Sequence, residues 1–228
     1  MDKLRLALKG VARDLSKAVA PGSTVGLGSG STVAVLIEEL APLVKSKHVH
    51  CVPTSTQIEV VASKNGFRLV PFGGSVDLVI DGADQIDGRL NLVKGGGGAL
   101  LREKVVMGSA RKIAVVASEK KFSRRLCEDG VMVPVEVVPI ARESAKVGLS
   151  RLGGVPRERL LPKGYPYFTE NGNVILDTKF KPLDDPTRLE VKVKAIPGVA
   201  EVGIFTFNPV TVWRLKADGT FDVLKKGM

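Results

Sequence analysis

Residues 24–32 read Thr-Val-Gly-Leu-Gly-Ser-Gly-Ser-Thr, so a short apolar stretch runs directly into a glycine-rich loop. An amphipathic pattern from Thr32 to Val44 follows the loop and predicts a helix. The stretch therefore predicts a strand, a loop and a helix in immediate succession.

The same alternation extends in both directions along the first half of the chain. A helix is expected at about 4–19. The further expected strands are 49–53, 68–71, 77–80 and 112–117, and the further expected helices are 55–65 and 99–110. Continuous apolar strands that alternate with amphipathic helices indicate a parallel sheet covered on both faces. This part of the chain is therefore predicted to be a Rossmann-like α/β domain.

A different order of elements begins after Gly130. Strands are expected at 132–139, 165–169, 173–178 and 199–205, with helices at 141–152 and 186–195. This is the βαββαβ order of a smaller ferredoxin-like α+β domain, with Asn171-Gly172 as a tight hairpin turn. A final hairpin, 211–215 and 221–224, is expected to return to the first sheet. The predicted domains are residues 1–130 with 206–228, and residues 131–205.

The composition is that of a globular protein, with 44% hydrophobic residues, 25% charged residues and a formal net charge of +10. The basic residues are scattered and aromatic residues make up only 5%, so the pattern does not favour nucleic-acid binding. A small anionic substrate explains a positive charge equally well. No apolar run approaches the roughly 20 residues that span a bilayer, so no membrane partner is expected. Cys51 and Cys127 form no CxxC pair, and a reducing cytoplasm is the expected location.

The first loop, Gly26–Thr32, has the features of an anion-binding loop. It offers backbone amides, three hydroxyl groups and the positive end of a helix. Its third glycine comes one residue too early for a dinucleotide fingerprint, and it lacks the lysine of a Walker loop. A phosphate monoester is the favoured ligand, although a tight turn without a ligand would give the same pattern.

The second motif, Asp81-Gly82-Ala83-Asp84-Gln85-Ile86-Asp87, follows an apolar strand. Ligands of open α/β sheets lie at the carboxyl ends of strands, which favours a role for Asp81 and Asp84. The spacing of the three acids does not fit the EF-hand, and Ala83 stands where a haloacid-dehalogenase-type phosphatase would need a second Asp. Asp87 is expected only to cap a turn.

The third motif, Lys94–Lys104, places four glycines before a helix. Such a run permits close approach of the backbone to a ligand. Glu103 is expected about one turn into the helix, with Lys94 on the other side of the loop. An acid, a cation and backbone amides are what enolisation requires, since one group moves the proton while the others hold an oxyanion. Taken alone, Glu103 could equally be an exposed carboxylate paired with Lys104 or Arg111.

These three motifs, together with residues 134–139, 171–177 and 196–199, resemble ribose-5-phosphate isomerase type A, and the resemblance covers nearly the whole chain. It implies that Glu103 is the proton acceptor. It also implies roles in catalysis for Asp81, Asp84 and Lys94, and substrate contacts for Ser29, Gly30, Ser31, Thr32, Gly82, Ala83, Gly95, Gly96, Gly97 and Lys121. Ser29 stands where the family usually has Thr, and Gln85 where it usually has Glu.

The resemblance implies a mechanism without cofactor or metal, in which ribose 5-phosphate and ribulose 5-phosphate interconvert through a cis-enediolate. The phosphate would be held by residues 29–32, by Lys121 or by both, and Asp81 would assist ring opening. A homodimer or homotetramer is expected. Two other classes of protein share parts of the pattern, a sugar-phosphate-binding regulator and a CoA-transferase-like enzyme with Glu103 as nucleophile. His48 and His50 lie beside no acid-rich motif, so they do not favour a metal site.

Overall fold

The computed structural model describes residues 3–208 and 210–225. Its internal contacts divide the chain into two compact units, which are described one at a time. The first unit contains the residues up to Ala83, residues 102–121 and the residues from Phe207 onward. The second contains Asp84–Leu101 and Phe122–Thr206. The second unit therefore begins earlier than the predicted boundary at residue 131, and the predicted domain limits also include residues 1–2, 209 and 226–228, which lie outside the described residues.

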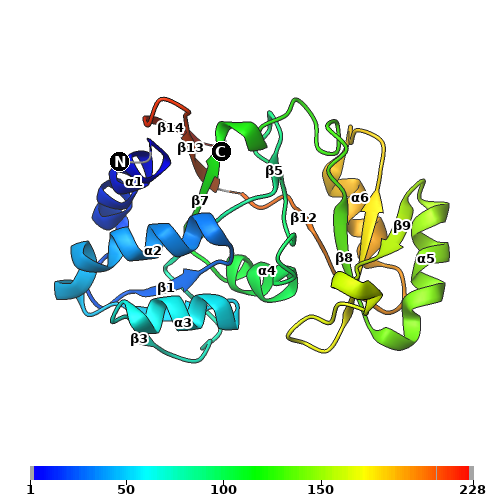
Figure 1. Ribbon diagram of the computed structural model, residues 1–228, viewed down its shortest axis with the longest axis horizontal. Helices are drawn as coiled ribbons and strands as arrows, with labels where there is room; N and C mark the ends of the chain where they lie inside the picture. Colours follow the sequence, from blue (N-terminus) through cyan, green and yellow to red (C-terminus); the bar gives the residue numbers. More distant parts are fainter. Residues whose placement is uncertain (1–2, 209, 226–228) are drawn as a thin grey trace. The chain divides into compact units, whose positions relative to one another are not determined.

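A seven-stranded sheet forms the centre of the first unit (Figure 1). Its strands are β1 (Thr24–Leu27), β2 (His50–Pro53), β3 (Arg68–Leu69), β4 (Leu78–Asp81), β7 (Ile113–Ser118), β13 (Val210–Leu215) and β14 (Phe221–Lys225). They lie in the order β14-β13-β7-β4-β1-β2-β3, and only the β13–β14 pair is antiparallel. The predicted Rossmann-like sheet and the returning hairpin are confirmed. Because β2 and β4 lie on opposite sides of β1, the sheet has its topological switch point between β1 and β4.

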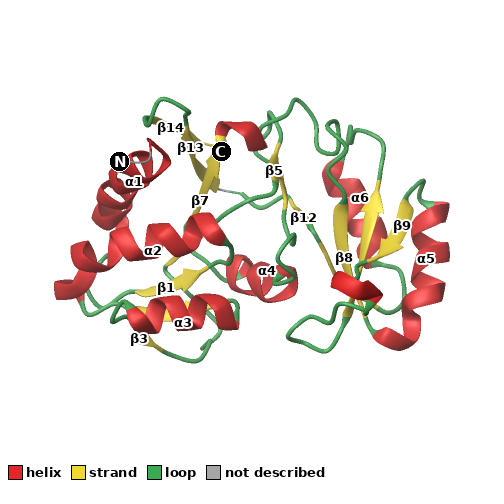
Figure 2. Cartoon of the chain, in the orientation of Figure 1, coloured by secondary structure: helices red, strands yellow, loops and turns green. Residues whose placement is uncertain are grey.

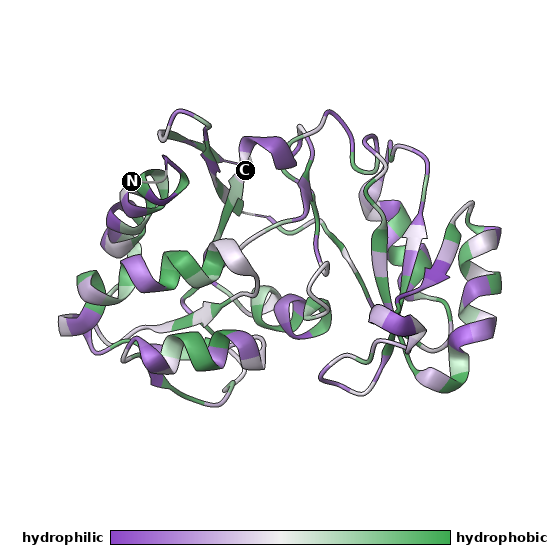
Figure 3. Cartoon of the chain, in the orientation of Figure 1, coloured by the Kyte–Doolittle hydropathy of each residue, from purple (hydrophilic) through white to green (hydrophobic). Residues whose placement is uncertain are grey.

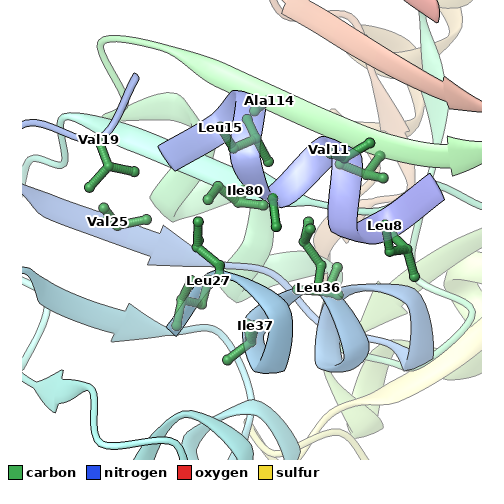
Figure 4. Close-up of a cluster of buried hydrophobic side chains, with 14 of the residues drawn as sticks. Leu8, Val11, Leu15, Val19, Val25, Leu27, Leu36, Ile37, Ile80 and Ala114 are labelled. Carbon is green, nitrogen blue, oxygen red and sulfur yellow. The ribbon is translucent and has the colours of Figure 1, made fainter. Parts of the chain in front are cut away.

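Helices cover both faces of this sheet. α1 (Lys3–Ala18), α2 (Ser31–Val44) and α3 (Thr56–Lys64) share one hydrophobic core with Val25 and Leu27 of β1. Figure 4 shows side chains of α1 and α2 pointing toward those of the strands in this core. Gly26 lies between Val25 and Leu27 and faces the opposite side of the sheet. A Cβ at Gly26 would lie 2.6 Å from the side chain of Val106 in α4 (Leu100–Gly108). The alternation of side chains along the strand therefore directs α4 to the opposite face.

The second unit has the predicted βαββαβ order. Its elements are β8 (Val133–Val137), α5 (Arg142–Arg151), β9 (Val155–Glu158), β10 (Val174–Lys179), α6 (Pro186–Lys194) and β11 (Val199–Val202). The strands are antiparallel and lie in the order β11-β8-β10-β9, which is a ferredoxin-like sheet. One face packs on α5 and α6 through a core that includes Val135, Leu149 and Val193. In Figure 3, bands of hydrophilic and hydrophobic colour alternate along helices such as α2 and α5, as expected of helices with one buried face.

The predicted strand at 165–169 is wrong, because the second strand of the ferredoxin-like sheet is β9, at Val155–Glu158. β9 is the edge strand and contains a proline and two charged residues, so its sequence resembles a loop. Residues 165–169 make only isolated bridges, and Figure 2 draws the connection between β9 and β10 mainly as loop. Asn171-Gly172 does form a turn, in which Gly172 has a φ of 77°. That turn closes a bridge between Phe168 and Val174 rather than a hairpin of two strands.

The second unit also contains a small sheet that the sequence analysis did not predict. It is formed by β5 (Gln85–Ile86), β6 (Leu92–Val93) and β12 (Ile204–Phe205), in the order β12-β6-β5. The single strand expected at 199–205 is divided at Gly203, whose N–H donates to the Pro134 carbonyl at 2.7 Å. A Cβ at Gly203 would lie 2.3 Å from the Lys94 carbonyl oxygen, so only glycine fits there. β6 leads directly into the four glycines.

No helix in the described part of the chain combines the length and the apolar character that crossing a bilayer requires.

Candidate active site

Several polar residues of the first unit lie at one edge of its sheet, because each follows the carboxyl end of a parallel strand. The strand-end loop, Gly28–Thr32, follows β1, and Asp81 ends β4. Lys121 follows β7 as the last residue of the short 3-10 helix Glu119–Lys121, and its side chain is exposed. The structure thus brings these predicted residues to the same edge, on both sides of the switch point.

Asp81 is buried directly against the strand-end loop. Its side chain has no exposed area, and its Oδ1 accepts a hydrogen bond of 2.6 Å from the N–H of Gly82. A Cβ at Gly28 would lie 1.9 Å from Asp81 Cγ, while the Gly28 N–H donates to the Ile80 carbonyl at 2.8 Å. Glycine is therefore required at position 28 by the carboxylate that packs on it.

Glu103 lies in the first turn of α4 and is only 4% exposed. Its Oε1 accepts a hydrogen bond of 3.3 Å from the backbone N–H of Ser29. This bond connects the start of α4 to the strand-end loop and orients the carboxylate. The alternative in which Glu103 is an exposed surface carboxylate is therefore wrong.

Two hydroxyl residues that the sequence analysis missed support the strand-end loop. Ser29 Oγ lies 2.9 Å from Ser55 Oγ and 3.0 Å from Thr54 Oγ1, and Thr54 donates to the Leu27 carbonyl at 3.0 Å. Thr54 is 1% exposed and Ser55 is 8% exposed. Their position directly after the strand expected at 49–53 is the only sequence signal for them, and the pairing of β2 with β1 is what brings them to Ser29.

The strand-end loop also begins α2. Gly30, with a φ of 107°, precedes the first helical residue, Ser31. The first turn of α2 contains no acidic residue, so the positive end of the helix dipole is not offset by a carboxylate of its own turn. Ser31 is exposed and Thr32 is half-buried. These features agree with the predicted anion-binding role.

The second unit holds Asp84 and the glycine loop, Lys94–Gly98. Asp84 donates its own N–H to the Val93 carbonyl at 2.8 Å, and its Oδ2 accepts from the Gly96 N–H at 2.7 Å. Gly95 and Gly98 have φ values of 107° and 85°, which favour glycine. The carboxylate of Asp84 therefore binds the loop directly, a contact that the sequence analysis did not predict.

Lys94 is buried, with 3% of its area exposed. Its N–H donates to the Gly203 carbonyl at 2.9 Å, and its Nζ lies 5.8 Å from the centre of the Phe205 ring. An ammonium over an aromatic face gains a favourable cation–π interaction. The sequence identified Lys94 through its neighbouring glycines but gave no sign of its burial.

Asp87 has the structural role that was predicted. Its Oδ1 accepts from the N–H groups of Arg89 and Asn91 at 2.9 and 2.8 Å, and its Oδ2 accepts from Asn91 Nδ2 at 2.9 Å. Gln85 is buried, and its Oε1 accepts from the Cys127 N–H at 2.6 Å. Both side chains therefore stabilise the second unit locally.

The two cysteines are buried and make no disulfide. Burial raises the pKa of the Cys51 thiol and of the Cys127 thiol to about 12 in each case. Both are therefore protonated at neutral pH, and neither serves as a thiolate nucleophile. Among residues 3–208 and 210–225, no three His, Cys, Asp or Glu side chains are grouped as a metal-binding set.

A parallel α/β sheet with a buried carboxylate beside its switch point, and with a glycine-rich loop at the start of a helix, is typical of enzymes that bind a small anion. Comparison with known proteins identifies the family. Residues 50–219 match the family model of ribose 5-phosphate isomerase A, also called phosphoriboisomerase A. The ribose-5-phosphate isomerase A of Methanosarcina acetivorans is 45% identical over 213 residues, which cover 91% of this chain and 89% of that protein.

Two solved structures are similar over almost their whole length. The ribose 5-phosphate isomerase A of Methanocaldococcus jannaschii has a TM-score of 0.88 at 37% identity, covering 98% of each chain. A D-ribose-5-phosphate isomerase in complex with phospho-erythronic acid has a TM-score of 0.89 at 33% identity, covering 96% of this chain and 97% of that one. The chain belongs to the ribose 5-phosphate isomerase A family, and it is an aldose–ketose isomerase that interconverts D-ribose 5-phosphate and D-ribulose 5-phosphate.

Proposed function

We propose that this chain isomerises ribose 5-phosphate by proton transfer through a cis-enediolate, with Glu103 as the base. Glu103 removes the proton from C2 of the open-chain aldehyde and returns it to C1, while the hydroxyl proton moves from O2 to O1. The aldehyde becomes a primary alcohol and C2 becomes a ketone, so no external oxidant or reductant is needed. The 3.3 Å bond from the Ser29 N–H to Glu103 Oε1 is the observation that carries the proposal, because it fixes a buried carboxylate beside the strand-end loop.

The phosphate group of the substrate is assigned to the strand-end loop, to Lys121, or to both. Backbone amides at the start of α2, the hydroxyls of Ser31 and Thr32 and the exposed Lys121 ammonium are suited to a phosphate dianion. Gly82 and Ala83 continue the same edge of the sheet and are proposed to contact the sugar. Contacts with a group that does not react contribute equally to substrate and transition-state binding, so they lower KM rather than raise kcat.

Asp81 is proposed to assist ring opening by exchanging a proton with the sugar oxygens. Its complete burial against Gly28 holds the carboxylate in one orientation. Asp84 is proposed to orient substrate hydroxyls. Lys94 and the amides of Gly95 and Gly97 are proposed to stabilise the negative oxygen of the enediolate, while the Gly96 N–H holds Asp84, since a buried ammonium and fixed N–H donors act strongly on a developing charge.

The direct test is to incubate the purified protein with ribose 5-phosphate in the presence of a chelator and to measure ribulose 5-phosphate. The proposal predicts turnover that chelation does not change. Loss of activity in chelator, with recovery on addition of Mg²⁺ or Zn²⁺, would reassign Asp81 and Asp84 as metal ligands. Acyl exchange with CoA, without turnover of the sugar phosphate, would support the CoA-transferase alternative.

Phospho-erythronic acid, which is bound in a similar solved structure, provides a second test. It combines a phosphate with a carboxylate, and a carboxylate resembles the enediolate in charge. We expect it to inhibit this enzyme competitively with ribose 5-phosphate. Inhibition that added substrate does not relieve would contradict a shared site.

The assembly of the chain as a homodimer or homotetramer, and its location in the cytoplasm, stay predictions. Light scattering coupled to gel filtration measures the first directly. A monomer at assay concentration would contradict it.

A further inference from the structure

The carbonyl groups of the glycine loop are bound by a distant segment of the second unit. Arg159 Nη1 donates to the carbonyl oxygens of Gly95 and of Gly96, at 3.0 Å in each case. The Tyr167 hydroxyl donates to the Gly97 carbonyl at 3.2 Å. Three consecutive carbonyls of the loop therefore point toward this one segment.

Arg159 is itself held in a single orientation. Its Nε donates to Asp177 Oδ2 at 2.8 Å and its Nη2 donates to Asp177 Oδ1. The two side chains are only 16% and 17% exposed. The Arg159 N–H also donates to the Ile175 carbonyl at 2.8 Å, and the Tyr167 ring lies 5.7 Å from the guanidinium carbon. A bidentate ion pair between strand β10 and the end of β9 thus fixes the plane of the guanidinium.

The connection that contains Tyr167 is anchored at its far end as well. Glu136 of β8 is completely buried, and its Oε1 accepts from Thr169 Oγ1, Asn171 Nδ2 and Asn173 Nδ2 at 2.8 to 2.9 Å. These bonds hold the turn that leads into β10. The segment between β9 and β10 is therefore a supported structure, and it can hold the glycine loop in place.

The direction of the carbonyls determines the direction of the amides. In a trans peptide the C=O of one residue and the N–H of the next point to opposite sides. The Gly96 N–H donates to Asp84 Oδ2, and the Gly98 N–H donates to the Gly95 carbonyl. The Gly97 N–H has no acceptor within residues 3–208 and 210–225, and Gly97 is exposed. A Cβ at Gly97 would meet no atom within 4 Å, so a ligand atom can approach this amide.

We propose that Arg159 is a positioning residue for the isomerisation. Clamped by Asp177, it orients the peptide between Gly96 and Gly97 so that the Gly97 N–H is directed at the negative oxygen of the enediolate. This inference rests on the proposed function, in which the amides of the glycine loop stabilise that oxygen. The shape of the guanidinium is what matters, because its fork binds one carboxylate and two carbonyls at once, which an ammonium cannot reproduce.

The test compares Arg159→Lys with Arg157→Lys. Arg157 is a suitable control because it lies two residues earlier, on β9, is exposed, and has no bond to the glycine loop within the described residues. Arg159→Lys is expected to lower kcat by about 10- to 100-fold, less than the roughly 10²- to 10³-fold that removal of an oxyanion donor costs, because the donor stays and only its orientation is loosened. KM should change by less than about threefold. Arg157→Lys should behave as wild type. In protein labelled with [¹⁵N]glycine, the amide resonances of Gly96 and Gly97 should move in Arg159→Lys and not in Arg157→Lys.

The inference would be overturned if kcat is unchanged in Arg159→Lys, or if kcat falls but the Gly96 and Gly97 resonances do not move. In either case, a fully active wild type would leave the proposed function intact. An inactive wild type would instead refute the proposed function. If Arg159→Lys does not fold, as judged by circular dichroism, Asp177→Asn keeps Arg159 and weakens only the ion pair that holds its guanidinium in place. That variant should lower kcat a few-fold and move the Gly96 and Gly97 resonances, and absence of both effects would also overturn the inference.

Discussion

The strand-end loop and the glycine loop both use glycine to bring backbone close to a ligand, yet they are built in opposite ways. In the strand-end loop the glycine makes room for a carboxylate, since Asp81 occupies the space that a Cβ at Gly28 would fill. In the glycine loop, Gly96 and Gly97 are exposed, and a Cβ at Gly97 would enter open space. Gly28 is therefore packed against a carboxylate, whereas Gly97 is open on its Cβ side and lies in a loop whose carbonyls are bound by Arg159 and Tyr167.

The difference corresponds to two requirements of the proposed reaction, a base held in a fixed position and backbone donors that stay accessible. A base that removes a proton must be held in position, and Glu103 is fixed by a helix and by the Ser29 amide. Backbone donors that stabilise an oxyanion must remain accessible, and the loop proposed for this role is restrained through its carbonyls, by Arg159 and Tyr167. Adding a Cβ at Gly28 should therefore disturb structure and chemistry together, whereas adding one at Gly97 should change stability little.

The largest effect is expected from Glu103→Gln. This change keeps the shape of the side chain and removes the proton acceptor, so kcat should fall by about 10²- to 10⁴-fold with little change in KM. Steady-state kinetics measure both constants. Glu59→Gln, an exposed acid in the first turn of α3, is the control and should turn over normally. Near-normal kcat in Glu103→Gln would refute its role as the base.

Gly28→Ala should disturb both stability and turnover. The added Cβ would lie 1.9 Å from Asp81 Cγ, so the carboxylate and the loop must shift. Overpacking of this kind costs about 1–3 kcal/mol, which corresponds to a fall in Tm of roughly 3–10 °C. Displacement of a catalytic group can lower kcat by about 10²-fold. Calorimetry and kinetics that find both quantities at wild-type values would show that this loop is not packed as described.

Lys121→Ala should act mainly on substrate binding. A phosphate contact that is equal in ground and transition states changes KM more than kcat, and we expect KM to rise by about 5- to 20-fold. Lys120→Ala removes the neighbouring exposed charge and provides the control. A fall confined to kcat would place Lys121 near the reacting carbons instead.

Gly97→Ala should have the smallest effect on stability. Its Cβ meets no neighbour, so the free energy of unfolding should change by less than about 1 kcal/mol and can rise slightly through the lower entropy of the unfolded chain. Thermal unfolding compares it directly with Gly28→Ala. A fall in Tm as large as that of Gly28→Ala would remove the distinction between the two loops.

The sequence predicted the first region better than the second for physical reasons. Strands of a buried parallel sheet are continuous apolar runs, so β1, β4 and the residues at their carboxyl ends can be predicted from the local sequence pattern alone. β9 is a short polar edge strand, and residues 165–169 nearby contain more aromatic residues, so the sequence pattern favours a strand there instead.

The support of the glycine loop was missed for the same kind of reason. Arg159 lies 64 residues from Gly95 in the chain, and no periodic pattern relates the two. Likewise, Thr54 gives no sign that it supports Ser29 until β1 and β2 are paired. Local patterns predict the groups that are proposed to react, whereas the residues that position them depend on contacts between distant segments.

The path of the hydrogen tests the central claim, proton transfer by Glu103, most directly. The measurement uses ribose 5-phosphate deuterated at C2, turned over in ordinary water, with the label at C1 of ribulose 5-phosphate followed by NMR or mass spectrometry. The account predicts slower turnover than with the unlabelled substrate and partial loss of deuterium, because a carboxylic acid that carries the proton exchanges it with water before returning it. Complete transfer of deuterium to C1, by an enzyme that requires an added divalent metal ion for turnover, would contradict it.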